Sequence, residues 1–481
     1  MLKKSKMSNL YQKRRHTILP DVLPQITSPC FVEDRWNSHG LPRVLAVHMV
    51  SFLPLTTFLC VRGVNKYWNK VTYVDAALPH TVDTRDWKTI RTDEDERLPR
   101  VFFSMLPVTL YVGGTLHRSD IGRLCGRKPD ASSLRSPPPR GTRTTRLHLD
   151  IGNAAMKWNV HKVTAIDALA VTYPYVTHLT VANTSQYSGN ALGIDGVFKF
   201  VHLVRLEVDG TVGDGRPMHL PPTLHYIRMK LCQQDMCMDT YVSLPCLTTL
   251  HIQRSIGYRS LHFILHNLLR LHTLRFASLQ SPSFDDHRIE KPSDVFSSSS
   301  PSSSSTLTSL TIDRIENVSI ASAILAWMPA LQHCSLGKVH DLSPQLWYMH
   351  HERQNVDLRF LELHFDAHLT NADRLQDTIA SVANLTHLTR LDCLVPVNIA
   401  TYAGKIGEPG SLPNLPLFQP LTKLVGLSHL SLVYSDDPRF WIPPGLVGLQ
   451  RLTICSPLDK YVKIHYPNLI IDQKPYVGHH H

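Results

Sequence analysis

Residues 247–252 read Leu-Thr-Thr-Leu-His-Ile, a hexad with apolar side chains at its first, fourth and sixth positions. The same apolar skeleton recurs over the last two thirds of the chain, and from residue 203 to residue 271 successive hexads begin 21, 23 and 24 residues apart. A leucine-rich chain supplies one or two such hexads by chance, but not twelve in register. The other copies begin at Thr144, Val176, Leu203, Leu224, Leu271, Leu307, Leu331, Leu358, Leu388, Leu427 and Leu449.

A short apolar hexad that returns at this period is the signature of leucine-rich repeats. Each hexad predicts one strand, and the segments between hexads can form helices, as where Leu261, Ile264 and Leu268 share one helical face. No single repeat can bury its own apolar face, so the repeats must stack. The predicted fold class is α/β: a leucine-rich-repeat solenoid over residues 144–472, with a curved parallel sheet and outer helices. Twelve strands spaced by about 4.8 Å would give a sheet about 50 Å long.

Two inserts interrupt the period. Residues 281–306 hold a serine-rich run and lengthen one interval between hexads to 36 residues, and residues 396–420 hold five prolines and lengthen another to 39. Inserts in a solenoid become loops. The asparagine or cysteine usually expected three residues after a hexad is mostly missing, so the repeats must close their turns in another way. That position holds Thr184, Thr211, Ser255, Leu279 and Val339.

The outward positions of the hexad are the candidate binding residues. Because side chains alternate along a strand, the fourth and sixth residues point into the core, and the third and fifth point to the concave face. Aromatic residues beside arginines on such a face have the composition of an interface centre. A generic solvated sheet without binding energy is the alternative. The candidate residues are Arg205, Glu207, Tyr226, Arg228, His251, Arg275, His333, Phe360, Glu362, Arg390 and Asp392.

Residues 41–74 have a different pattern, which predicts three short helices. The segment opens with Leu-Pro, and its apolar residues then recur at helical spacing. Pro54 ends the first helix, because proline lacks the backbone donor and clashes with the preceding turn. Such a small unit is usually completed by a partner or by the adjacent domain. The residues that carry the pattern are Leu41, Pro42, Leu45, Met49, Phe52, Leu53, Leu55, Val64 and Trp68.

This segment resembles the F-box, a family that opens with Leu-Pro, continues through an apolar helix to Ser-aromatic-Leu and ends in Val-x-basic-x-Trp. The matching residues are 41–42, 51–53 and 64–68. Val44 and Ala46 depart from the pattern, in which an acidic residue and a larger aliphatic residue are common. The resemblance implies that the residues of the three helices dock on the Skp-type adaptor of an SCF complex and, through it, on a cullin. A plain helical cap for the solenoid is the alternative.

The charge lies mainly outside the repeats. Net charge is +11, and much of the excess falls in the N-terminal arm and in residues 123–146. A basic chain can bind nucleic acid, with a steep salt dependence, but charge in these places is typical of tails and linkers. Nucleic acid is therefore disfavoured as a partner. The expected organisation around the repeats is a basic arm at 1–38, an F-box-like domain at 39–76, a connector with a first divergent repeat strand at 77–143, and a tail at 473–481.

The sequence carries no catalytic pattern. It lacks a glycine-rich phosphate loop, a Gly-x-Ser-x-Gly elbow and a His-Glu-x-x-His motif. Of the 28 histidines, those in the repeats are spread about one per repeat at mixed hexad positions, and the nine cysteines form no framework, so no metal or other cofactor is expected. Cys334 and Cys393 fall at buried hexad positions, where a thiol acts as a small hydrophobe.

These observations predict a non-enzymatic protein-recognition module. Its expected role is that of the substrate-binding subunit of an SCF-type cullin ubiquitin ligase, with the concave face holding the target protein. A leucine-rich-repeat scaffold without a ligase role is the alternative. The polar, basic N-terminus is unlike a signal peptide, and no membrane partner is expected, so the cytoplasm or the nucleus is the predicted location.

Overall fold

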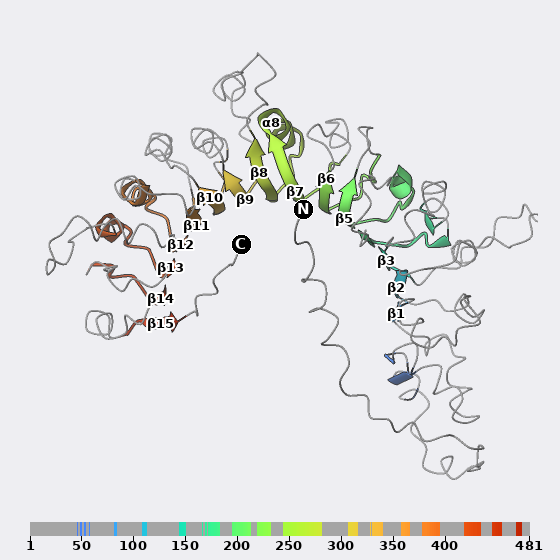
Figure 1. Cartoon of the computed structure of the whole chain (residues 1–481), viewed down its shortest axis with the longest axis horizontal. Coiled ribbons are helices and arrows are strands. Elements are labelled where there is room, and N and C mark those ends of the chain that lie inside the picture. The colour runs from blue at the N-terminus through green and yellow to red at the C-terminus, as the bar shows by residue number, and fades with distance from the viewer. Residues whose placement is uncertain are drawn as a thin grey trace, which may run out of the picture.

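For the residues that it describes, the computed structural model places fifteen strands in one sheet, in which spatial order follows sequence order and neighbours pair in parallel. Figure 1 shows the sheet curving along the inner side of an arc. The strands are β1 (Thr81–Asp83), β2 (Thr109–Val112), β3 (Arg146–Asp150), β4 (His178–Ala182), β5 (Arg205–Val212), β6 (Tyr226–Leu231), β7 (Thr249–Gly257), β8 (Thr273–Gln280), β9 (Ser309–Ile315), β10 (His333–Val339), β11 (Phe360–Phe365), β12 (Arg390–Leu394), β13 (His429–Val433), β14 (Arg451–Ile454) and β15 (Ile470–Gln473).

The structure describes part of the chain, and most of that part belongs to the repeats. The described residues are 46, 49–50, 52–53, 57, 81–83, 108–112, 144–150, 166, 169–170, 172–182, 195–212, 219–231, 244–280, 306–315, 328, 330–339, 357–365, 378–394, 418–433, 445–454 and 468–473. No helix among them is long and apolar enough to cross a membrane.

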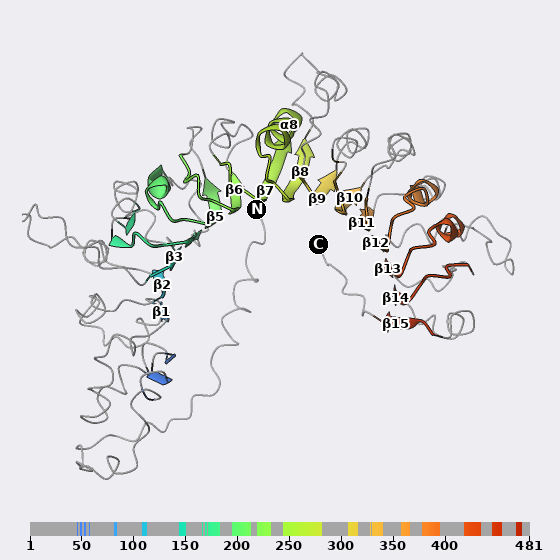
Figure 2. The same ribbon diagram turned by 180° about the vertical axis from the view of Figure 1, so that it is seen from behind.

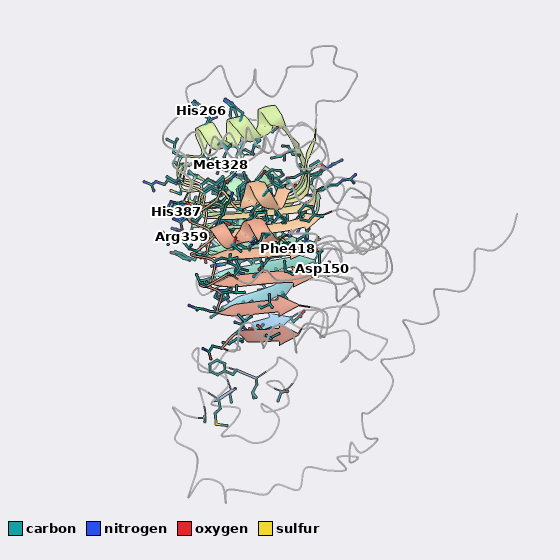
Figure 3. All side chains as sticks on the ribbon, turned by 90° about the vertical axis from the view of Figure 1, so that its left-hand side faces the viewer. Asp150, His266, Met328, Arg359, His387 and Phe418 are labelled. Atoms are coloured by element: carbon teal, nitrogen blue, oxygen red, sulfur yellow. The ribbon has the colours of Figure 1, made fainter. Side chains whose placement is uncertain are left out.

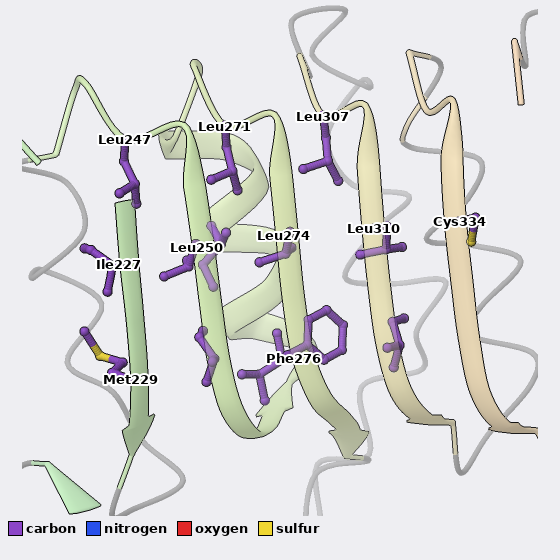
Figure 4. Close-up of a cluster of buried hydrophobic side chains, with 14 of the residues drawn as sticks. Ile227, Met229, Leu247, Leu250, Leu271, Leu274, Phe276, Leu307, Leu310 and Cys334 are labelled. Carbon is purple, nitrogen blue, oxygen red and sulfur yellow. The ribbon is translucent and has the colours of Figure 1, made fainter. Parts of the chain in front are cut away.

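The hexad explains the core. Leu250, Leu274 and Leu310 occupy the fourth position of neighbouring hexads, and all three are fully buried. Cys334 continues the same row in β10. Figure 4 shows these side chains on one side of the sheet, beside the first-position leucines of the same repeats. Each repeat therefore completes the core of its neighbour, as the stacking argument requires.

The outer side of the arc carries the helical elements. In the described part of the chain, those with defined bounds are η6 (Asp195–Lys199), α8 (Tyr258–Asn267) and η7 (Gln419–Lys423), and residues 378–382 are helical as well. α8 buries Leu261, Ile264 and Leu265, as the helical spacing predicts. Figures 1 and 2 show α8 on the outer side of the arc from both directions. In Figure 3, seen edge-on, Arg359 and His387 lie at the edge where strands begin, and Asp150 lies at the opposite edge. The predicted leucine-rich-repeat solenoid is confirmed for this part of the chain.

Hydroxyl groups tie the strand starts together. The backbone N–H groups of Thr248 and Thr249 both donate to the carbonyl of His225, at 2.9 and 3.0 Å. The hydroxyl of Thr248 donates to the same carbonyl at 3.0 Å. The hydroxyl is thus a third donor to a carbonyl oxygen that already accepts two N–H groups, and it links the start of one strand to the preceding repeat. The same hydroxyl contact to the preceding repeat is made by Thr177, Thr308, Thr389 and Ser428.

The strand ends show how the repeats manage without the usual asparagine. β7 to β10 continue past the hexad, and a register shift between Ile252 and Ser255 marks a bulge in β7. Beyond it, Ile256 pairs with Leu279 and Leu279 with Ile315, and all three side chains are buried. The strand pairing and the core thus continue past the hexad, into the segment where a leucine-rich repeat usually turns.

Three strands exceed the twelve that the hexads predict. β2 lies in the segment that fits a divergent repeat, whereas β1 and β15 have no complete hexad. In β15, Asn468 and Gln473 stand at the first and sixth positions, where apolar residues are expected. The expected sheet length was therefore too short, and fourteen intervals of about 4.8 Å give about 67 Å.

The F-box-like segment is described at a few residues. Ala46 and Val50 are helical and buried, and Leu53 packs against the core. Met49 and Phe52 are exposed, at 52% and 65%. The other docking candidates lie outside the described residues, and with them most of the predicted three-helix domain; they are Leu41, Pro42, Leu45, Leu55, Val64 and Trp68.

Candidate functional site

The strand register places the outward residues in two continuous columns on the concave face. Arg205 pairs with Tyr226, and Tyr226 with Thr249, in the third-position column. Glu207 pairs with Arg228, and Arg228 with His251, in the fifth-position column. The structure gathers the candidate residues into two groups. The N-terminal cluster holds Arg205, Glu207, Tyr226, Arg228, His251 and Arg275, and the C-terminal cluster holds His333, Phe360, Glu362, Arg390 and Asp392.

The N-terminal cluster is organised around a stacked arginine. The guanidinium of Arg205 lies 3.9 Å from the ring centre of Tyr226, in cation–π contact. Glu207 fixes the guanidinium from the same strand, with its Oε1 2.7 Å from Nε. The Tyr226 ring meets His251 edge to face at 5.4 Å, and its hydroxyl lies 3.4 Å from Nδ1. These contacts hold a large, half-buried aromatic side chain in a fixed position on the face.

Two arginines with a histidine between them form a column in the same cluster. Arg228, His251 and Arg275 are direct neighbours across β6, β7 and β8. Arg228 donates from Nε and Nη2 to the amide oxygen of Gln253, at 2.8 and 2.7 Å with the amide turned to satisfy both partners. Arg275 pairs with Asp313 at 3.1 Å. Burial lowers the pKa of His251, and Arg275, Arg228 and Arg205 lower it further, so the ring is neutral at pH 7.

The C-terminal cluster repeats this design in reverse strand order. The guanidinium of Arg390 lies 4.7 Å from the ring centre of Phe360 and is held by Asp392, with 2.7 Å between Nη2 and Oδ2. The Phe360 ring in turn contacts His333 at 4.2 Å between ring centres. Each cluster therefore contains an arginine that is held by a carboxylate two residues later in the same strand. An aromatic residue lies on the adjacent strand, and a histidine lies on the strand after that.

Glu362 lies beside the second cluster as a fixed negative charge. His364 Nε2 lies 2.8 Å from its Oε1. The hydrogen bond from His364 lowers the pKa of Glu362 most, burial opposes this, and Ser335 and His333 lower it again, to about 2. The carboxyl group is therefore ionised at pH 7. Burial and the neighbouring arginine Arg390 lower the pKa of His333, although Glu362 and Asp392 oppose this.

The two halves of the face differ in charge. In the N-terminal cluster, the partner of Arg228 is the neutral amide of Gln253. In the C-terminal half, Arg390 pairs with Asp392 and Arg451 with Asp472, each against a carboxylate. Between the clusters, the columns hold small hydroxyl residues, namely Thr249, Thr273, Ser309 and Thr311. The N-terminal patch is therefore net basic, with three arginines against two carboxylates, whereas the C-terminal cluster is net acidic, with one arginine against two carboxylates. The stripe of small hydroxyl side chains separates the two.

The hexad misses a third outward column. Gln253, Asp313 and His364 follow their hexads at the seventh position, and each bonds to a residue of the two main columns. They share the face because the strands continue past the hexad. The alternation of side chains along a strand predicts that the seventh residue faces outward like the third and fifth, and this pattern could have identified them. Tyr111 of β2, stacked on His148 at 4.2 Å, also lies outside the predicted set.

Among the described residues, no group of three or more His, Cys, Asp or Glu side chains could hold a metal ion. Cys334 and Cys393 are fully buried in the core, as predicted for small hydrophobes. Burial raises the pKa of Cys334 to about 12 and raises that of Cys393, where Asp392 adds to the effect. Both thiols are therefore protonated.

Comparisons with known proteins are distant. No family model matches the chain, and no curated protein does. An internalin from Listeria monocytogenes is 13% identical, with a TM-score of 0.32 over 68% of this chain and 73% of that one. A structure of the Toll–Spätzle complex from Drosophila is 12% identical, with a TM-score of 0.35 over 77% of this chain. The match spans about half of that second chain, 54% of its length.

Proposed function

We propose that the chain is a protein-recognition module whose concave face binds a partner protein. The observation that carries this proposal is the pair of preorganised clusters, each with a half-buried aromatic ring on the concave face, held between an arginine and a histidine. Tyrosine and arginine dominate the energetic centres of protein interfaces, and rigid side chains lose little entropy on binding. A sheet about 67 Å long offers enough area for a folded protein.

The F-box-like segment gives this module its proposed role, as the substrate-binding subunit of an SCF-type cullin ubiquitin ligase. Support comes from Met49 and Phe52, two large apolar side chains that are exposed beside a buried helical face. Exposed apolar residues of this kind fit a docking surface for an adaptor. The chain itself would do no chemistry, and would raise the local concentration of its target near the conjugating enzyme.

Binding to a purified Skp-type adaptor tests the ligase role. Phe52→Asp should abolish co-purification with the adaptor, because it places a charge on the exposed apolar patch. Phe52 is a better target than Leu53, which packs against the core. Phe198→Asp is the matched control, since Phe198 is another exposed aromatic, in η6, and should leave adaptor binding unchanged.

A wild-type chain that folds but does not bind the adaptor would overturn the ligase role and leave a recognition scaffold. In that case, proteins bound by the concave face should not rise in level under proteasome inhibition.

A further inference from the structure

We infer that the N-terminal cluster binds an acidic segment of the partner protein, with a carboxylate seated over His251 between Arg228 and Arg275. This inference rests on the proposed function of the concave face, and specifies its partner. It concerns the chemistry of one patch, β5 to β8, and not the whole sheet.

The strand register supplies the geometry. Arg228 and Arg275 lie on the strands directly flanking His251, at the same height in the sheet. Neighbouring strands are about 4.8 Å apart, so the Cα atoms of the two arginines stand about 10 Å apart, with that of His251 between them, a span that two long arginine side chains can close. Guanidinium groups bind carboxylates through paired hydrogen bonds. A carboxylate above His251 is therefore within reach of two such donors.

The present partners of the two arginines are weak competitors for a carboxylate. Gln253 offers Arg228 hydrogen bonds but no charge. Asp313 and Arg275 form an ion pair whose side chains are 47% and 54% exposed. Exposed pairs of this kind contribute little to stability, so a ligand carboxylate can exchange with Asp313 at little cost.

His251 adds a third donor. Its Nδ1 faces the Tyr226 hydroxyl, so when that hydroxyl donates, the ring proton is on Nε2. Arg275, Arg228 and Arg205 all act on the ring, which locates their combined positive field at this point of the face. A bound anion would offset that field. Tyr226 and Arg205 then form one wall of the patch, with an aromatic surface for the apolar part of the segment.

The arrangement favours protein over nucleic acid. Glu207 lies within the patch and Asp313 at its edge, and both would repel a continuous phosphate backbone. A polypeptide can place single carboxylates between these groups and apolar side chains over Tyr226. The C-terminal half provides the contrast, because Arg390 and Arg451 both face carboxylates, whereas Arg228 of the N-terminal patch faces the neutral amide of Gln253.

Fluorescence anisotropy of a labelled peptide of alternating Glu and Thr residues tests the inference with the full chain. At low salt, the double variant Arg228→Gln/Arg275→Gln should bind about tenfold or more weakly than the wild type. Arg451→Gln is the matched control, since it removes a cation from the same face outside the patch, and should stay within about twofold. Unchanged thermal unfolding of each variant shows that the fold is kept.

Three results would overturn the inference: equal binding by the wild type and the double variant, equal binding of a Gln-Thr peptide, or tighter binding of a mixed-sequence oligonucleotide. Competition with inorganic phosphate distinguishes binding of an acidic peptide from binding of any small anion. Displacement of the peptide by phosphate at matched charge would also contradict the inference. If one of these results is found but a partner protein still binds the concave face, the proposed function stands and only the inference is wrong. If no partner binds the concave face, the proposed function and the inference are both wrong.

Discussion

Two cysteines take the place of larger apolar residues in the core. Cys334 stands at the fourth hexad position and Cys393 at the sixth, and both side chains are fully buried from solvent. The sequence predicts both correctly, because the hexad alone fixes which positions point inward. It does not predict the protonation of the thiols, which depends on how completely the neighbouring repeats close over them.

Thiol labelling checks this packing. Iodoacetamide under native conditions should modify the half-buried Cys246 well before Cys334 or Cys393, because only thiolates react and burial keeps these two protonated. Site-resolved mass spectrometry over time is the measurement, with labelling in urea as the control for intrinsic reactivity. Labelling of all three at one rate in the native protein would show that the core is open at these repeats.

Glu362 should make stability depend on pH. Its pKa lies at about 2 instead of the usual 4.5, so its contribution is complete above pH 4.5 and is lost as the pH falls toward 2. Glu362→Gln should lower the free energy of unfolding by about 1 kcal/mol at pH 7, and the difference from wild type should shrink below pH 4.5. Urea titrations at a series of pH values measure this.

Asp357→Asn is the control for that experiment, because the Asp357–Arg359 pair is largely exposed and should contribute little at any pH. A difference between Glu362→Gln and wild type that stays constant from pH 7 to pH 3 would contradict the assignment of the pKa shift.

At the scale of the element, the bulged strands depend on close backbone contact. A Cβ atom added at Gly337 of β10 would lie 2.2 Å from the carbonyl oxygen of Asp313 in β9. Gly337→Ala should therefore lower the free energy of unfolding by about 1–3 kcal/mol, because one backbone must move. Gly426→Ala is the matched control, with its nearest contact at 3.8 Å, and should change stability by less than about 0.5 kcal/mol.

Urea unfolding of both glycine variants, monitored by circular dichroism, measures the two changes in the free energy of unfolding. An equal and small effect of the two substitutions would mean that the β9–β10 contact is not as close as described.

The elements also show where sequence reasoning succeeds and stops. The two outward columns follow from the hexad, because a period of two and a fixed starting leucine determine which residues face out and which are paired. The strand extensions do not follow, because the bulge after Ile252 changes the register by one residue. The Arg275–Asp313 contact depends on such an extension, because Asp313 follows its hexad in β9. The strand β15 was not predicted for another reason, since it lacks apolar residues at two hexad positions.

At the scale of the molecule, curvature turns a repeated strand into a binding face. Helical elements such as α8 lie on the outer side and strands on the inner side, so the sheet bends toward the surface that carries the two clusters. Because the two clusters draw on seven strands, β5 to β8 and β10 to β12, no single repeat could present them. The central claim is that the partner protein lies against this inner surface.

Site-specific photo-crosslinking tests that claim most directly. A crosslinking amino acid at Thr273, on the stripe between the clusters, is compared with one at the exposed His266 of α8 on the outer side. The account predicts that Thr273 captures the partner protein and that His266 does not. Capture of the same partner from His266 but not from Thr273 would contradict it.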